Sequence, residues 1–77
     1  MKYIKVNSFD EIPKNYTGIV EYTGGIKKWC MNGKIHREDG PAIEWSDGVK
    51  WWYLNDKHYT KEEYDIEMSR PNALRLV

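Results

Sequence analysis

Apolar and polar residues alternate through the middle of the chain in four short runs, which form two pairs. The runs GIVEYT and IKKWCM flank Gly24-Gly25, and the runs AIEWS and VKWWYL flank Asp47-Gly48. Alternation with a period of two is typical of β-strands, and these dipeptides are typical of two-residue hairpin turns. The pattern therefore predicts two tandem β-hairpins.

The two predicted hairpins are related by an internal repeat of 23 residues. A shift of this length aligns residues 16–38 with residues 39–61. Six of the aligned positions are identical: Glu21/Glu44, Gly25/Gly48, Lys27/Lys50, Trp29/Trp52, Asn32/Asn55 and Lys34/Lys57. Because turn glycines and apolar strand positions match together, the repeat indicates a duplicated structural unit.

Two-residue turns would fix the register of both hairpins and divide their residues between two faces. The expected core face carries the apolar set that the repeat preserves: Val20, Tyr22, Trp29, Met31, Ile43, Trp45, Trp52 and Leu54. The opposite face is expected to carry Glu21, Lys28, Cys30, Glu44, Trp51 and Tyr53. On this face, the part from the first hairpin would be charged and the part from the second hairpin would be aromatic.

The flanking segments are predicted to cap the sheet. Residues 2–6 alternate like a short strand, and Ser8 with Glu11 forms a capping-box pattern that predicts a helical turn over residues 9–12. A second capping box, Thr60 with Glu63, predicts a helix over residues 61–68 that ends before Pro71. Tyr64 and Met68 share one face of this helix, where they could cover an open end of the sheet.

The chain is therefore expected to form one mainly β domain with a single antiparallel sheet. Its expected parts are an N-terminal cap at 1–15, repeats at 16–38 and 39–60, and a C-terminal helix and tail at 61–77.

Composition excludes several functional classes. Twelve Lys and Arg balance twelve Asp and Glu among 77 residues, which is unlike a basic nucleic-acid tail or a polybasic membrane anchor. Apolar runs are too short for a membrane span, and the first residues lack the apolar stretch of a signal peptide. The single cysteine, Cys30, cannot form an internal disulfide, so a cytoplasmic location is expected.

The turns and the connector between the hairpins carry a family resemblance. Residues 32–42, NGKIHREDGPA, fit the phrase W-Y-x-N-G-K-x-H-R-x-D-G-P-A at every fixed position from its Asn onward. With Tyr16-Thr17-Gly18 and Asp47-Gly48, this run makes residues 16–60 resemble the MORN-like repeats of bacterial and bacteriophage proteins. In the second unit, His58-Tyr59-Thr60 replaces the His-Arg-x-Asp-Gly-Pro phrase, so the array is expected to stop at two units.

The resemblance implies a β-hairpin scaffold that serves as an interaction surface and shares no catalytic residue. It also suggests an accessory role, such as inhibiting or sequestering a component of a host defence system. For a phage-encoded chain, the location would be the host cytoplasm.

The connector also contains the most reactive-looking cluster, residues 36–39. His36 beside carboxylates could act as a general base or bind a metal, and a hydrolase using His36 with Asp39 is one alternative. The favoured interpretation is structural: Asp39 orders the Asp-Gly-Pro turn, while His36 and Arg37 brace the connector. Cys30 has no predicted base beside it, and His36 and His58 lack zinc-ligand spacing, so neither a catalytic residue nor a cofactor or metal is expected.

Aromatic residues carry the functional prediction, because the chain has four Trp and six Tyr. Trp51 and Tyr53 would point away from the expected core, where aromatic rings are typical of protein-binding hot spots. The sequence leaves open whether this face is exposed, forms a second core or mediates homodimerisation. The expected partner-binding residues are Trp51, Tyr53, Glu44, Lys28 and Tyr59.

A protein partner is therefore expected, and nucleic acid is not, because the zero net charge lacks the electrostatic footprint of nucleic-acid binding. The alternative belongs to another functional class: an oligomer that sequesters a small ligand or nucleotide. Its pockets would be lined by aromatic residues and by Lys or Arg at subunit boundaries.

Overall fold

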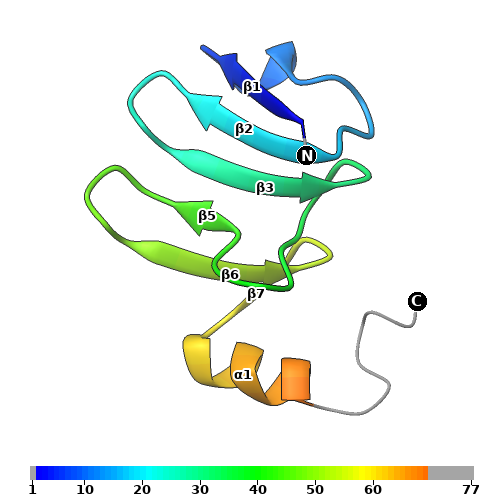
Figure 1. Ribbon diagram of the computed structural model, residues 1–77, viewed down its shortest axis with the longest axis vertical. Coiled ribbons are helices and arrows are strands. Elements are labelled where there is room, and N and C mark those ends of the chain that lie inside the picture. Colours follow the sequence, from blue (N-terminus) through cyan, green and yellow to red (C-terminus); the bar gives the residue numbers. More distant parts are fainter. Residues whose placement is uncertain (1, 70–77) are drawn as a thin grey trace.

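A single open sheet dominates the computed structural model, which describes residues 2–69 (Figure 1). Its seven strands among these residues are β1 (Tyr3–Val6), β2 (Gly18–Tyr22), β3 (Lys27–Met31), β4 (Lys34–Ile35), β5 (Ile43–Glu44), β6 (Lys50–Leu54) and β7 (Lys57–Tyr59). A 3-10 turn, η1 (Phe9–Glu11), and a helix, α1 (Lys61–Ser69), flank the strands. The predicted mainly β fold is confirmed, and so are both flanking helical segments; Pro71 lies outside the described residues.

The spatial order of the strands is β1-β2-β3-β5-β6-β7, and β4 pairs with β3. β5 pairs with β3 at Lys27 and Lys28, whereas β4 pairs with β3 at Cys30 and Met31. β4 and β5 therefore follow different halves of the same strand. β1 pairs with β2 in parallel, which the sequence pattern did not predict, and the other pairs are antiparallel.

The predicted register of both long hairpins is wrong by one residue, because their loops contain three residues rather than two. Val20 lies opposite Lys28, and Ile43 lies opposite Trp51. In the second loop, Trp45 N–H donates to the Val49 carbonyl at 2.9 Å, and Gly48 N–H donates to the Trp45 carbonyl at 3.0 Å. Gly48 has a φ of 93°, but Asp47 lacks the positive φ that a two-residue type I′ turn requires.

Two-residue turns are found instead at Asn32-Gly33 and Asn55-Asp56. All four residues have positive φ, as a type I′ turn requires, and the turns connect β3 with β4 and β6 with β7. Asp56 also bonds the neighbouring strand, because its carboxylate accepts a hydrogen bond from Ile35 N–H at 2.6 Å.

The shifted register divides the predicted core between the two faces. We call one side the aromatic face; its strand and loop residues include Val20, Tyr22, Ile26, Lys28, Ile43, Trp45, Trp51, Tyr53 and His58. The other side is the helix face; its residues include Glu21, Trp29, Met31, Glu44, Trp52, Leu54 and Tyr59. Each face therefore carries part of the apolar set that was expected on one side.

The N-terminal segment covers one end of the aromatic face. Tyr16, in the crossover between the parallel strands β1 and β2, is buried with Val6 and Val20. Its hydroxyl donates a hydrogen bond to the Ile19 carbonyl at 3.0 Å. Ile12 and Cys30 pack against this cluster, so this end of the face forms a small core.

Helix α1 packs near β6 and β7, at the opposite end of the sheet from β1 (Figure 1). The predicted capping box is present: Thr60 N–H donates to Glu63 Oε1 at 3.0 Å, and Glu63 N–H donates to Thr60 Oγ1 at 3.1 Å. Tyr64 is buried, with its ring 6.3 Å from that of Trp52. Within residues 2–69, no helix combines the length and the apolar character needed to cross a membrane.

Candidate functional site

His36, the first reactive-looking residue of the connector, is buried and uses both ring nitrogens within the protein. Nδ1 accepts a hydrogen bond from Asn55 N–H at 3.0 Å, so this nitrogen carries no proton. Nε2 then carries the ring proton and donates it to Glu38 Oε2 at 2.9 Å. The geometry matches the predicted bracing role, since β4 and the β6–β7 turn are joined through this ring.

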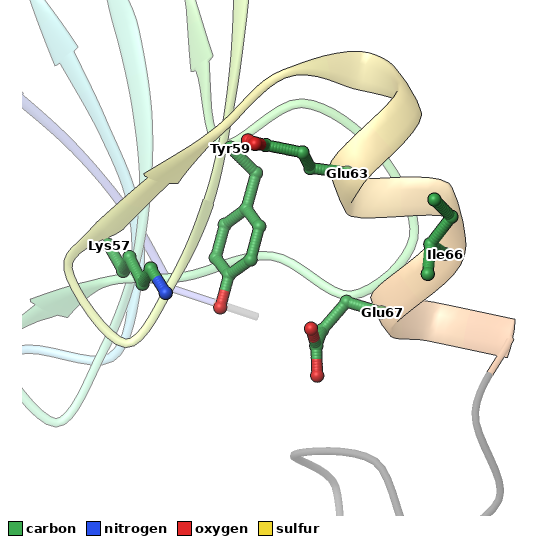
Figure 2. Close-up of a pocket in the computed structure, with 5 residues that line it drawn as sticks. All are labelled: Lys57, Tyr59, Glu63, Ile66 and Glu67. Atoms are coloured by element: carbon green, nitrogen blue, oxygen red, sulfur yellow. The ribbon is translucent and has the colours of Figure 1, made fainter.

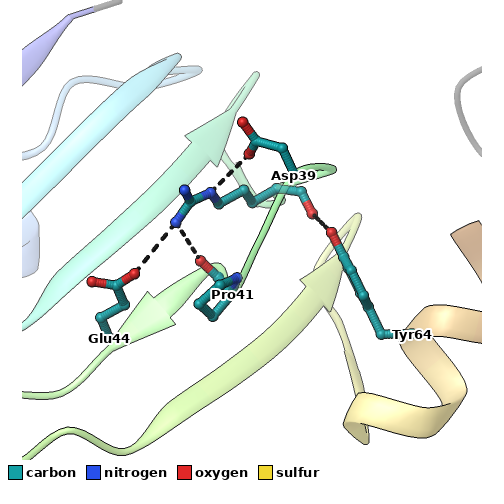
Figure 3. A network of polar contacts seen from close by, with 5 residues as sticks. Asp39, Pro41, Glu44 and Tyr64 are labelled. Carbon is teal, nitrogen blue, oxygen red and sulfur yellow. Dashed lines mark hydrogen bonds and ion pairs between the residues drawn. The ribbon is translucent and has the colours of Figure 1, made fainter.

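Arg37 forms the centre of a polar network in the connector, and its partners Asp39, Pro41, Glu44 and Tyr64 are labelled in Figure 3. Its Nε donates to Asp39 at 2.8 Å, and its Nη1 donates to the Pro41 carbonyl at 3.0 Å and contacts Glu44 at 3.4 Å. The guanidinium lies 4.0 Å from the centre of the Trp29 ring. The hydrogen bond from Arg37 holds the pKa of Asp39 below its usual value.

The small residues of the connector motif are explained by close packing. A Cβ on Gly40 would lie 2.9 Å from Cζ of Arg37, so a side chain there would displace the guanidinium. Ala42 is fully buried; its carbonyl accepts from Trp29 N–H at 2.8 Å, and its N–H donates to the Trp51 carbonyl at 2.9 Å. The motif that carries the family resemblance therefore has a structural role at these positions.

Cys30 is half-buried and lies opposite Gly18 on β2 and Ile35 on β4. Burial raises the pKa of its thiol, which Lys28 lowers to a smaller extent. A thiol with a raised pKa is mostly protonated at neutral pH and is a weak nucleophile. This environment is typical of a packing cysteine.

The part of the aromatic face beyond the N-terminal core carries a continuous stripe of rings. Trp45 and Trp51 meet edge to face at 5.3 Å, and the ring of His58 lies 5.3 Å from Trp51 and 5.1 Å from Tyr53. Trp51 remains 38% exposed. The stripe runs from Trp45, which follows β5, across β6 to His58 of β7.

An apolar groove adjoins this stripe. It has a volume of about 270 Å³ and is lined by Tyr22, Ile26, Lys28, Ile43 and Trp45. The ammonium of Lys28 lies 5.2 Å from the centre of the Tyr22 ring, within the range of a cation–π contact. The groove and the stripe share Trp45, so together they form one surface.

The predicted partner-binding residues lie on both faces of the sheet. Trp51, Tyr53 and Lys28 lie on the aromatic face, whereas Glu44 and Tyr59 lie on the helix face. Glu44 contacts Arg37 there. Sequence reasoning missed Tyr22, Ile26, Trp45 and His58 as parts of this surface, because the two-residue turns placed Tyr22 and Trp45 in the core. The signal for a three-residue loop was present in Thr-Gly-Gly and Ser-Asp-Gly.

Tyr59 belongs to a separate pocket between β7 and α1 (Figure 2). This pocket has a volume of about 320 Å³ and is lined by Lys57, Tyr59, Glu63, Ile66 and Glu67. Glu63 is already used to cap α1, and Lys57 lies over the Tyr59 ring at 5.2 Å. Because Glu63 and Glu67 line it, this pocket is acidic, whereas no Asp or Glu lines the groove on the aromatic face.

Comparison of the chain with protein-family models, curated proteins and solved structures found no match. The relation to MORN-like repeats thus stays a prediction from the motif.

Proposed function

We propose that the chain is a non-catalytic protein-binding module and that it docks its partner through the aromatic face. The observation that carries this proposal is the stripe of aromatic rings in mutual contact beside an open apolar groove, with Trp51 38% exposed. Tyr and Trp supply large contact areas and are enriched in binding hot spots. Their mutual packing here also reduces the side-chain entropy that binding would otherwise cost.

The internal use of the connector supports a binding role rather than catalysis by His36 and Asp39. Both nitrogens of His36 are engaged, and Asp39 is paired with Arg37. The motif resemblance supports a narrower form of the proposal, in which the partner is a component of a host defence system that the chain inhibits or sequesters. This narrower form rests on the motif of residues 32–42.

The test compares Trp51→Ala with Tyr3→Ala. Tyr3 is a matched control because it is also aromatic and exposed but lies on the helix face, opposite Ile19. Each purified variant is first checked for folding by urea unfolding. The intact chain then captures a partner from lysate, the partner is purified separately, and its Kd is measured for all three chains by calorimetry.

We expect Trp51→Ala to weaken binding at least about tenfold, the equivalent of about 1.4 kcal/mol, and Tyr3→Ala to leave it nearly unchanged. Equal losses in the two folded variants, or no loss in Trp51→Ala, would contradict the proposed surface. Light scattering and native mass spectrometry test the alternative, because a stable oligomer that retains a small molecule would favour ligand sequestration.

A further inference from the structure

Charge is distributed unequally between the two faces of the sheet. The strand residues of the aromatic face include Lys28 and His58 but no Asp or Glu. Glu21 and Glu44 lie on the helix face, where Glu21 accepts a hydrogen bond from Tyr3 and Glu44 contacts Arg37. None of the ion pairs found among residues 2–69 includes Lys28.

Two residues of the groove also contain polar groups without a partner. The Tyr22 hydroxyl and the Trp45 Nε1–H are shielded from water, and neither has a hydrogen-bond partner among the described residues. An indole N–H can only donate, and a buried donor without an acceptor is unfavourable. Because both atoms are shielded, an acceptor from outside would reach them only if the side chains rotate toward the groove on binding.

We infer that the groove receives an acidic side chain that is flanked by apolar residues of the protein partner. The carboxylate would lie near the Lys28 ammonium and accept hydrogen bonds from Trp45 Nε1–H and the Tyr22 hydroxyl. The apolar neighbours would pack on Ile26 and Ile43 and extend toward the ring of Trp51. Charge complementarity selects this occupant, because the groove combines an apolar lining with a cation and unused donors. The inference rests on the proposed function and specifies the chemistry of the partner.

The test uses the ¹⁵N-labelled full chain and two peptides, acetyl-Leu-Glu-Leu-amide and acetyl-Leu-Gln-Leu-amide. The peptides match in size and differ in charge, and the four Trp indoles give separate reporters for the two faces. We expect the Glu peptide to shift the Trp45 indole signal and the Lys28 and Ile43 amides. Its Kd should be at least about fivefold lower than that of the Gln peptide, since only the Glu peptide forms an ion pair.

Lys28→Gln and Lys50→Gln form the matched pair of variants. Lys50 is exposed on the helix face, opposite Glu44, so its replacement removes the same charge from the other side of the sheet. Lys28→Gln should abolish the preference for the Glu peptide, and Lys50→Gln should retain it. Equal affinities for the two peptides, or equal effects of the two variants, would overturn the inference.

Two further outcomes would also reject this occupant. One is the absence of shifts with about 10 mM of the Glu peptide, a concentration at which a millimolar complex would be mostly formed. The other is a set of shifts that depends on protein concentration alone, which would identify a second copy of the chain in the groove. Partner binding that requires Trp51 but not Lys28 would reject this inference and leave the proposed function intact.

Discussion

Arg37 joins the connector, two strands and the helix through its side chain and its backbone. The guanidinium contacts Trp29 of β3, and the backbone N–H donates to the Tyr53 carbonyl of β6 at 3.3 Å. The Arg37 carbonyl accepts a hydrogen bond from the Tyr64 hydroxyl of α1 at 2.6 Å (Figure 3). A planar guanidinium can stack flat on a ring while its N–H groups donate in its plane to two partners, whereas a lysine ammonium has no plane that can stack.

We therefore expect Arg37→Lys to lower the free energy of unfolding by about 1–3 kcal/mol, because hydrogen bonds from the guanidinium and its stacking on Trp29 are lost. Urea unfolding monitored by Trp fluorescence measures the change. An unfolding midpoint equal to that of the unchanged chain would contradict the bracing role.

Asp39→Asn is the control for this variant, because it removes the ion pair and keeps the guanidinium. The Asp39 side chain is 86% exposed, so the pair is screened by water and its loss should cost less than about 1 kcal/mol. Since the pKa of Asp39 is lowered in the folded state, its contribution is present at neutral pH and is lost as pH falls through that pKa. If Asp39→Asn lowers the free energy of unfolding as much as Arg37→Lys does, the ion pair with Asp39 accounts for the stabilisation by Arg37.

The structural role of His36 and Arg37 could be inferred from sequence, but most of their partners could not. The bond from Arg37 to Asp39 spans two residues and follows from the local chain. By contrast, His36 binds Asn55 across 19 residues and Arg37 binds Tyr64 across 27. Such contacts depend on which strands become neighbours, and periodicity within each strand does not determine that.

At the scale of elements, loop length decides which side of the sheet each residue occupies. Successive strand residues point to opposite faces, so one additional loop residue moves the partner strand's side chains to the other side. Ser46-Asp47-Gly48 places the left-handed residue third, and the Asp47 carboxylate accepts a hydrogen bond from Val49 N–H at 3.1 Å. The same change in the first hairpin moves Trp29 to the helix face.

Asp47→Gly distinguishes the two loop types. A type I′ turn needs a positive φ at this position and would be stabilised by glycine. In the observed loop, the variant loses the bond to Val49 and adds backbone freedom, so we expect the unfolding free energy to fall by about 1 kcal/mol. Thermal and urea unfolding provide the measurement. Ser46→Ala is the control and should have little effect, because Ser46 is exposed. A rise in stability for Asp47→Gly would support the two-residue turn.

At the scale of the whole molecule, the buried apolar residues form one region at each end of the sheet, with Ala42 and Ile43 buried between the two. Val6, Tyr16 and Val20 are buried beneath the N-terminal segment, whereas Leu54 is buried at the end of β6, the strand on which α1 packs. A chain of 77 residues is expected to have a stability of about 4–12 kcal/mol, so losing either region should affect the entire fold. The aromatic stripe lies between these regions, with Trp51 and His58 exposed and Trp45 and Tyr53 half-buried.

The neighbouring residues Trp51 and Trp52 should therefore respond differently to replacement by Ala. Trp52 packs against Tyr64 of α1, and its loss is expected to cost about 3 kcal/mol and to release the helix from the sheet. Trp51 is 38% exposed, and its loss should cost only about 1 kcal/mol. Circular dichroism and urea midpoints of the two variants provide the test. Equal costs would show that the assignment of the two faces is wrong.

The sequence by itself determined the mainly β architecture, the 23-residue spacing of β3 and β6, and the capping box of α1. These features depend on local alternation, turn residues and contacts within a few positions, which the order of residues specifies directly. Only the tertiary structure decided the parallel pairing of β1, the division of the predicted site and the groove beside Trp45. Those features depend on a one-residue difference in loop length and on contacts between distant segments, so their energies are defined only when the strands are assembled.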